Sequence, residues 1–252
     1  LNFTFIIQIL LELDPCKPDL FEPFGLEHFA PVLAFTLLTY LAITQKSKWP
    51  LVIHQRIAIV TSLTLALLNI LHPFYLHHNG NFDASKDLPF HLCNFLTLIY
   101  PIVAFYQSRW LFGILYFWIL VGTFQAILTP DLKESFPDPV YFKYWIVHCG
   151  LVFLTLHGLF VFEFKIYKKD LYRAVLGANL YLLFSFAVNL TTGGNYFFSM
   201  KKPEAASLLD FLGPWPWYLI TGQVAMLILF HIYYLPIHYM GQRTHIVLNA
   251  KL

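Results

Sequence analysis

Long runs of apolar residues constrain the fold of this chain more than any other feature of its sequence. Several of these runs approach 20 residues, the length that an α-helix needs to cross about 30 Å of hydrocarbon. Hydrophobic residues make up 58% of the 252 positions and charged residues only 12%, roughly half the charged fraction of soluble domains. The sequence therefore predicts an all-α, polytopic integral membrane protein.

Seven transmembrane helices are expected, separated by segments rich in helix breakers and charged residues. Their predicted ranges are 27–45, 51–75, 88–107, 110–129, 144–166, 171–192 and 214–240. Stretches such as QKSKWP, TPDLKESFPDP and TTGGN fall between them and stop a helix. We expect an interfacial segment at 1–24, one seven-helix domain at 25–240 and a cytoplasmic tail at 241–252.

Basic residues are distributed unevenly between the two ends of the predicted bundle. The loops 46–50, 108–109 and 167–170, the adjoining helix ends and the C-terminus carry ten Lys and Arg residues, and the rest of the chain carries six. Because cytoplasmic loops are enriched in Lys and Arg, the sequence predicts an outer N-terminus and a cytoplasmic C-terminus. The net charge of +2 and the lack of a basic arm argue against a nucleic-acid partner.

Polar side chains collect at the predicted outer ends of the helices. They include Asn69, His72, His91, Cys93, Asn94, Gln125, Thr129, Asp131, His148, Cys149, Asn189 and Asn195. Any one of them is better explained as a helix cap or as a neighbour's hydrogen-bond partner. The whole set favours a cavity, because polar groups at membrane depth normally face the bundle interior and the inner ends have no comparable cluster.

Cys93 has three interpretations: a nucleophile, a buried packing residue, or half of a disulfide with Cys149. On a helix that begins at 88, His91 and Cys93 lie about 200° apart around the axis. A base for the thiol is therefore expected from another helix. His148 is expected on the same side and at a similar depth, and a thiol paired with an imidazole gives the thiolate that attacks an acyl carbonyl.

Further polar groups are candidates for stabilising the oxyanion or for binding substrate. Gln125 and Asn195 are the oxyanion candidates. The helix-breaking pair after Asn189, in NLTTGGNYFF, is either a plain helix end or a backbone wall of the cavity. Lys201 is a candidate for contacting a lipid phosphate, and Trp215 for flanking an acyl chain.

A metal site is the remaining chemical alternative. Its candidate ligands are His72, His77, His78, His91 and His148. Their spacing matches no standard ligand pattern. Neither a metal nor an organic cofactor is therefore expected.

Four segments resemble the YwaF-like bacterial membrane proteins and their animal relative, transmembrane protein 164. They are LPFHLCNF, YFKYWIVHCGLV, NLTTGGNYFFSMKKP and FLGPWPWY, and the resemblance extends over residues 25–240. It implies a lipid acyltransferase whose catalytic cysteine is Cys93 and whose histidine is His148. Where the animal branch has Asn-Pro-Cys-His, this chain has Phe90-His91-Leu92 before the cysteine and Asn94 after it, so the resemblance does not specify the lipid.

These observations predict a thiol-dependent acyltransferase or lipid hydrolase of the bacterial cytoplasmic (inner) membrane, with its site facing outside. Cys93 and His148 are the predicted catalytic pair. The predicted binding and oxyanion residues are Asn195, Gln125, His91, Asn94, Asn189, Trp215 and Lys201. Phospholipid and lysophospholipid are the expected partners.

Two other classes of function fit the same residues. In a transporter or small-molecule-binding protein, the polar pocket holds a solute without forming a covalent bond. In a structural or assembly protein, the outer cluster is a docking surface.

Overall fold

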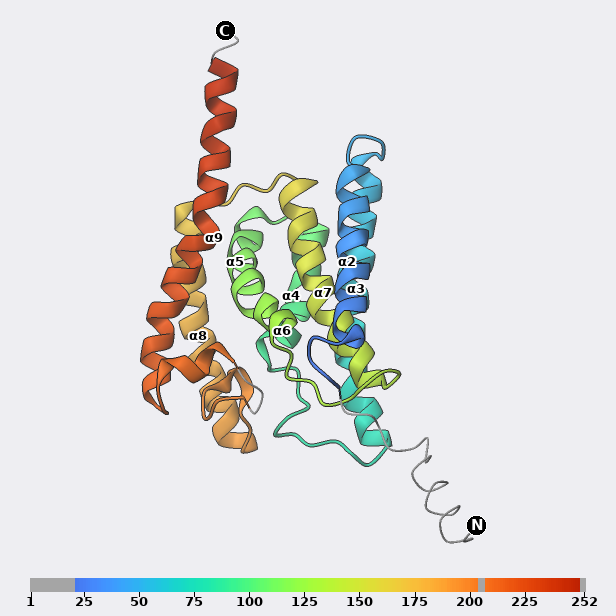
Figure 1. Ribbon diagram of the computed structural model, residues 1–252, viewed down its shortest axis with the longest axis vertical. Coiled ribbons are helices and arrows are strands. Elements are labelled where there is room, and N and C mark those ends of the chain that lie inside the picture. The colour runs from blue at the N-terminus through green and yellow to red at the C-terminus, as the bar shows by residue number, and fades with distance from the viewer. Residues whose placement is uncertain (1–20, 204–206, 250–252) are drawn as a thin grey trace, which may run out of the picture.

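The computed structural model describes residues 21–203 and 207–249, with side chains as far as 239. Helix accounts for 74% of the structure, and the described ranges contain no strand. The elements in chain order are α2 (Leu26–Thr44), α3 (Leu51–His78), α4 (Leu92–Tyr106), α5 (Arg109–Trp118), the π-helical turn η1 (Ile119–Thr123), α6 (Phe124–Leu128), α7 (Pro139–Phe160), α8 (Lys168–Thr192), the 3-10 helices η2 (Tyr196–Phe198) and η3 (Leu208–Leu212), and α9 (Trp217–Asn249) (Figure 1).

The bundle has the seven helices that the sequence predicts. Within the described residues, six helical units are long and apolar enough to cross a membrane, counting α5, η1 and α6 as one unit over Arg109–Leu128. The seventh, α4, is a shorter apolar helix of 15 residues. Successive units run in opposite directions along the long axis (Figure 1). Of the predicted N-terminal segment, residues 1–20 lie outside the described residues.

Two helix starts differ from the predicted ones by four residues or more. The third helix begins at Leu92 and not at 88, because the chain turns just before it, with Phe90 N–H donating to Leu88 C=O at 2.8 Å. The fifth begins at Pro139 and not at 144. Asp138 accepts a hydrogen bond from Val140 N–H at 2.7 Å, and a carboxylate cap followed by proline is a strong start signal.

Burial places α5–α6 and α7 at the centre of the bundle and α2 and α9 at its periphery. Half or more of the central helices is buried, whereas α2 and α9 expose most of their length. Phe112, Phe117, Ile119 and Leu151 are completely buried in the core. The exposed side chains of α2 and α9 are largely apolar, as contact with lipid requires.

Small residues let the central helices approach closely. A Cβ atom on Gly150 of α7 would lie 2.9 Å from a methyl group of Leu65 in α3. A Cβ on Gly113 of α5 would lie 2.7 Å from the carboxyl carbon of Asp170 at the start of α8. Helix interfaces in membranes use small residues in this way, because van der Waals packing replaces the hydrophobic effect there.

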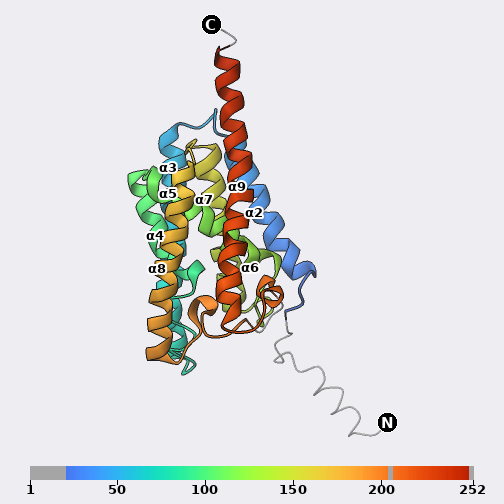
Figure 2. The same ribbon diagram turned by 90° about the vertical axis from the view of Figure 1, so that its left-hand side faces the viewer.

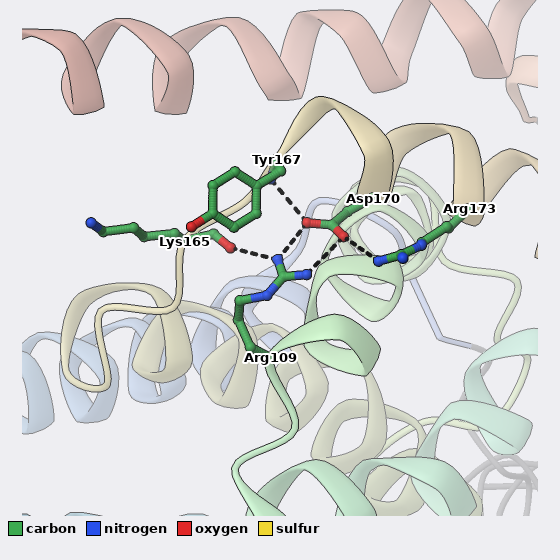
Figure 3. Close-up of polar contacts among 5 residues, drawn as sticks. All are labelled: Arg109, Lys165, Tyr167, Asp170 and Arg173. Atoms are coloured by element: carbon green, nitrogen blue, oxygen red, sulfur yellow. Dashed lines mark hydrogen bonds and ion pairs between the residues drawn. The ribbon is translucent and has the colours of Figure 1, made fainter.

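An ion-pair network fastens the start of α5 to the start of α8 (Figure 3). Asp170 is completely buried, and both of its oxygens accept from the guanidinium of Arg109, at 2.6 and 3.0 Å. Arg173 donates at 3.3 Å and the backbone N–H of Tyr167 at 2.9 Å. Arg109 also donates to the carbonyl of Lys165 at 3.0 Å. The carboxylate is thus fully satisfied in a place where an unpaired charge would be very costly.

The loops divide between the two ends of the bundle (Figure 1). Loops 45–50, 107–108 and 161–167 lie at one end, here called the basic end. The ion-pair network lies there, and Lys46 forms an ion pair with Glu163. Segments 79–91, 129–138, 193–203 and 207–216 lie at the opposite end, here called the cavity end. The loops of the basic end carry three lysines and one glutamate, whereas acidic residues outnumber lysines in the described segments of the cavity end, so the two ends differ in net charge.

Tyr196 organises the cavity end. Its ring is buried, and its hydroxyl donates to Ala84 C=O at 2.7 Å and accepts from Leu88 N–H at 3.1 Å. Asn189, near the end of α8, holds the backbone of the same tyrosine through hydrogen bonds of 2.7 and 2.9 Å. The chain after α8 and the chain before α4 are therefore joined beside the first turn of α4.

Candidate active site

A cavity of about 560 Å³ opens at the cavity end. Its wall is built from the start of α4, from η1 and α6, from one face of α7, from the segment between α8 and α9, and from the first half of α9. Figure 2 shows this α8–α9 segment folded at the end of the bundle where α9 begins. The wall is mostly apolar, and its polar groups come mainly from α4, α6 and α7.

Cys93 lies in the wall of this cavity as the second residue of α4. It is partly exposed, and its Sγ is 3.5 Å from Thr123 Oγ1. Thr123 is completely buried and comes from the π turn η1. Because α4 starts at Leu92, Cys93 lies in its first turn, where unpaired backbone N–H groups and the helix dipole favour negative charge. The predicted helix start at 88 would place Cys93 five residues inside the helix, and that placement is wrong.

His148 lies in the wall of the same cavity, on α7. Its Nδ1 is 2.7 Å from the backbone carbonyl of Tyr144, and its ring packs on the Tyr144 ring with 4.1 Å between centroids. A carbonyl oxygen only accepts, so Nδ1 carries the hydrogen and Nε2 is left as the acceptor. In the described part of the chain no protein group bonds to Nε2. This is the tautomer that a general base requires.

Cys93 and His148 share the cavity, and no hydrogen bond joins them within the described structure. The thiol points toward Thr123. Catalytic hydrogen bonds are often long or misaligned before substrate binds, so the arrangement leaves both residues available for chemistry at one place.

His91 also faces the cavity, contrary to the expected helical geometry. It is the N-cap of α4 with an extended backbone, so the angle of about 200° calculated for a continuous helix does not apply. Its ring packs edge-on against Tyr196, with centroids 5.0 Å apart. Burial, and to a lesser extent the charge of Lys143, lower the pKa of His91 to about 4. It is therefore a neutral imidazole at pH 7.

Two carboxamides face the cavity as predicted, those of Gln125 on α6 and Asn94 on α4. Among the described residues no hydrogen bond engages either side-chain amide. Each is therefore a free donor for an oxygen atom bound near Cys93. The backbone carbonyl of Asn94, in contrast, is occupied by Asn69 Nδ2 at 2.9 Å.

Four other predicted site residues do not line the cavity. Asn189 is committed to Tyr196 and to Ser199 Oγ, the latter at 2.8 Å. Asn195 closes its own loop, donating to Lys201 C=O and accepting from two backbone N–H groups. Trp215 is half exposed and donates to Ser199 C=O at 3.2 Å, and Lys201 is exposed. These residues shape the α8–α9 segment behind the wall.

The disulfide alternative is wrong, because Cys93 and Cys149 are both free thiols. Cys149 is buried in a separate apolar cluster with Phe21, Ile127 and Trp145. The metal alternative gains no support. Residues 21–203 and 207–239 contain no group of three or more His, Cys, Asp or Glu side chains that could hold an ion.

The sequence alone did not single out Lys143, Tyr144 or Thr123. Lys143 and Tyr144 line the cavity together with Val147 and His148. Lys143 lies four residues before Val147 and Tyr144 four before His148, and residues four positions apart share a face of a helix. That spacing was a usable signal. Thr123 had none, because a π turn has no sequence signature as simple as a proline or a glycine pair.

The fold and the cavity define a class of protein: a seven-helix integral membrane protein with a cavity that is lined by a cysteine, two histidines and two lysines, among other residues. The chain belongs to the TMEM164 family, whose model matches residues 23–234. It is 28% identical over 230 residues to a protein of Treponema pallidum (strain Nichols) named only as uncharacterized, covering 90% of this chain and 94% of that one. No solved structure matches.

Proposed function

We propose that the chain is a lipid acyltransferase in which Cys93 is the nucleophile and His148 the general base. The observation that carries this proposal is their shared position in one mostly apolar cavity, with Cys93 in the first turn of α4 and His148 Nε2 unpaired. The resemblance of the FHLCN segment and of His148 to transmembrane protein 164 points to the same pair. An apolar wall suits an acyl chain, and the polar groups lie where an ester would be held.

In the first half-reaction Cys93 Sγ attacks the ester carbonyl of a phospholipid. The thiol proton passes to His148 Nε2, a carbon–sulfur bond forms, and the ester carbon–oxygen bond breaks. His148 then returns the proton to the departing lysolipid alcohol. In the second half-reaction the hydroxyl of another lysolipid attacks the thioester and gives its proton to His148, which returns it to the sulfur. Water in place of that lysolipid gives hydrolysis.

The oxyanion of each tetrahedral intermediate requires donors near Cys93. Gln125 and Asn94 have free amides in the cavity wall. The backbone N–H groups of the first turn of α4 are also free of helical partners. Donors of this kind are typically worth a hundredfold or more in rate, about 3 kcal/mol.

The proposal includes an orientation: the cavity end faces the outside of a bacterial inner membrane and the basic end faces the cytoplasm. Its support is the concentration of Lys and Arg at the basic end. In this orientation substrate enters from the outer leaflet.

The test uses purified chain reconstituted with acyl-labelled phospholipid and an unlabelled lysolipid. Transfer should be lost in Cys93→Ala, and His148→Gln should lower it by about 10²–10⁴-fold. Cys149→Ala is the matched control, since Cys149 lies in the other apolar cluster, and it should retain transfer. Intact-protein mass spectrometry should find one acyl chain on the parent enzyme and none on Cys93→Ala. Unchanged transfer in Cys93→Ala would overturn the mechanism and leave the cavity as a binding or transport site.

A further inference from the structure

Lys143 is a basic residue placed in the wall of the cavity without a protein partner. It is the fifth residue of α7, its side chain is half-buried, and it shares the cavity-facing side of the helix with Tyr144, Val147 and His148. Across the described residues its ammonium group forms no hydrogen bond or ion pair. A half-buried ammonium at membrane depth is costly unless an anion accompanies it.

The charges around Lys143 do not neutralise it by direct contact. Three imidazoles, those of His72, His91 and His148, interact electrostatically with its charge. Asp87 is the carboxylate whose charge acts on Lys143, and it does so without an ion pair. Asp131 also lines the cavity and has an interaction of its own.

Lys86, the other basic residue of the cavity wall, is already neutralised. Its ammonium lies 3.1 Å from the carboxylate of Asp83. Hydrogen bonds from the side chain and backbone of Ser85, with a further one from Lys86, lower the pKa of Asp83 to about 2. That carboxylate therefore stays charged at every physiological pH. Of the two lysines, Lys143 is the one that requires a further anion.

The opposite wall of the cavity is apolar. Its residues come from η3 and α9 and are Leu208, Leu209, Leu212, Ala225, Met226 and Leu229. A ligand that fills the cavity therefore needs an anionic group at one side and a hydrocarbon chain at the other. A phosphate is a suitable anionic group for the side of the cavity that holds Lys143, because lysine binds phosphate as a compact point charge.

We propose that the ammonium group of Lys143 binds the phosphate of a glycerophospholipid whose acyl chain lies against η3 and α9. This assignment rests on the proposed function and adds to it the residue that binds the phosphate of the substrate. Lys143 and His148 are five residues apart, about 7–8 Å along the axis of α7. Only the glycerol backbone separates the phosphate of such a lipid from its ester. A phosphate held at Lys143 thus brings the ester toward His148 and Cys93.

The experiment measures binding in a Cys93→Ala background, so that no acyl group is transferred. Two probes carry the same fluorescent acyl chain: a phosphatidylethanolamine and a diacylglycerol without phosphate. Inorganic phosphate is the soluble competitor. The added substitutions are Lys143→Met, Lys143→Arg and Lys201→Met, the last a matched loss of charge outside the cavity.

Lys143→Met should weaken phospholipid binding about tenfold, the typical effect of one charge-assisted hydrogen bond. It should leave diacylglycerol binding unchanged. Lys143→Arg should keep most of the phospholipid affinity, and Lys201→Met should keep all of it. Inorganic phosphate should fail to displace the phospholipid probe, because it lacks the chain.

Equal binding of phospholipid by Lys143→Met and its parent would overturn the assignment. So would an equal loss for both probes in a variant that keeps the parent's thermal transition, or displacement of the phospholipid by inorganic phosphate alone. If Lys143→Met fails to fold, Lys143→Gln replaces it. Intact phosphate-dependent binding with no acyl transfer by the Cys93 enzyme would reject the proposed function and retain the lipid site.

Discussion

At the scale of single residues, Asp170 shows how a charge is tolerated in this bundle. Its carboxylate is 0% exposed, whereas its main partner, Arg109, is 28% exposed. Gly113 provides the space, since a Cβ there would collide with the carboxyl group. The two members of the pair are therefore not equivalent. Removing Arg109 leaves a buried carboxylate with only the longer contact to Arg173 and the N–H of Tyr167, whereas removing Asp170 leaves a guanidinium that water can reach.

This asymmetry predicts that Arg109→Met destabilises the protein more than Asp170→Asn. The arginine substitution should lower the free energy of unfolding by about 3–5 kcal/mol, the cost of removing one partner of a buried ion pair, because the half-exposed Arg173 at 3.3 Å only partly replaces it. The asparagine substitution should cost about 1–3 kcal/mol, because the freed guanidinium can be hydrated. Unfolding in mixed micelles measures both.

Lys46→Met is the control for loss of a basic group at the same end. Its partner Glu163 is 74% exposed, and exposed ion pairs contribute under about 1 kcal/mol. If Asp170→Asn proved as costly as Arg109→Met, relative exposure would not be the governing factor.

At the scale of elements, η1 has the greatest influence on the site. A π turn inserts an extra residue into a helix and changes which side chains face a neighbour. Here it directs Thr123 Oγ1 toward Cys93 and places Val121 and Gly122 in the cavity wall. The hydroxyl accepts from the thiol and, once the thiol ionises, can turn and donate to the sulfur.

Thr123→Val should therefore lower the rate of acyl transfer about tenfold, as expected for losing one hydrogen bond to a charged group. The shape of the side chain is kept, so the thermal transition should change little. Thr155→Val is the control, because Thr155 is equally buried, donates to Leu151 C=O at 2.9 Å and does not line the cavity. An equal loss of rate in both variants would mean that the effect is general packing.

The elements also show what the sequence can and cannot predict. Hydrophobic run length was enough to identify all seven helices, because the bilayer imposes it. The start of α4 was misplaced because Leu88–His91 is apolar enough to read as helix but is held in a turn linked to Tyr196. The segment after α8 does line the cavity, through residues such as Phe197 and Phe198, but not through the asparagines that the sequence predicted as binding residues. Its asparagines read as free polar groups, and only the fold reveals that they close local turns.

At the scale of the whole molecule, the two ends of the bundle differ in the polar interactions that they contain. The basic end is fastened by ion pairs, and the cavity end holds the free polar groups that the proposed chemistry requires. Between them the core around α5 and α7 is closely packed. The proposed substrate thus reaches Cys93 only from the cavity end or through the wall formed with α9, so the orientation of the chain decides which leaflet supplies the lipid.

That orientation can be tested with two exposed loop positions, Ser47 at the basic end and Asn79 at the cavity end. Each is replaced by cysteine in a variant whose three native cysteines have been replaced by alanine. A membrane-impermeant thiol reagent should label Asn79→Cys in intact cells and Ser47→Cys only after the membrane is permeabilised. Labelling of Ser47→Cys alone in intact cells would show the opposite orientation, with the cavity at the cytoplasmic leaflet. Labelling of both would contradict the single crossing by α3 that separates these two positions.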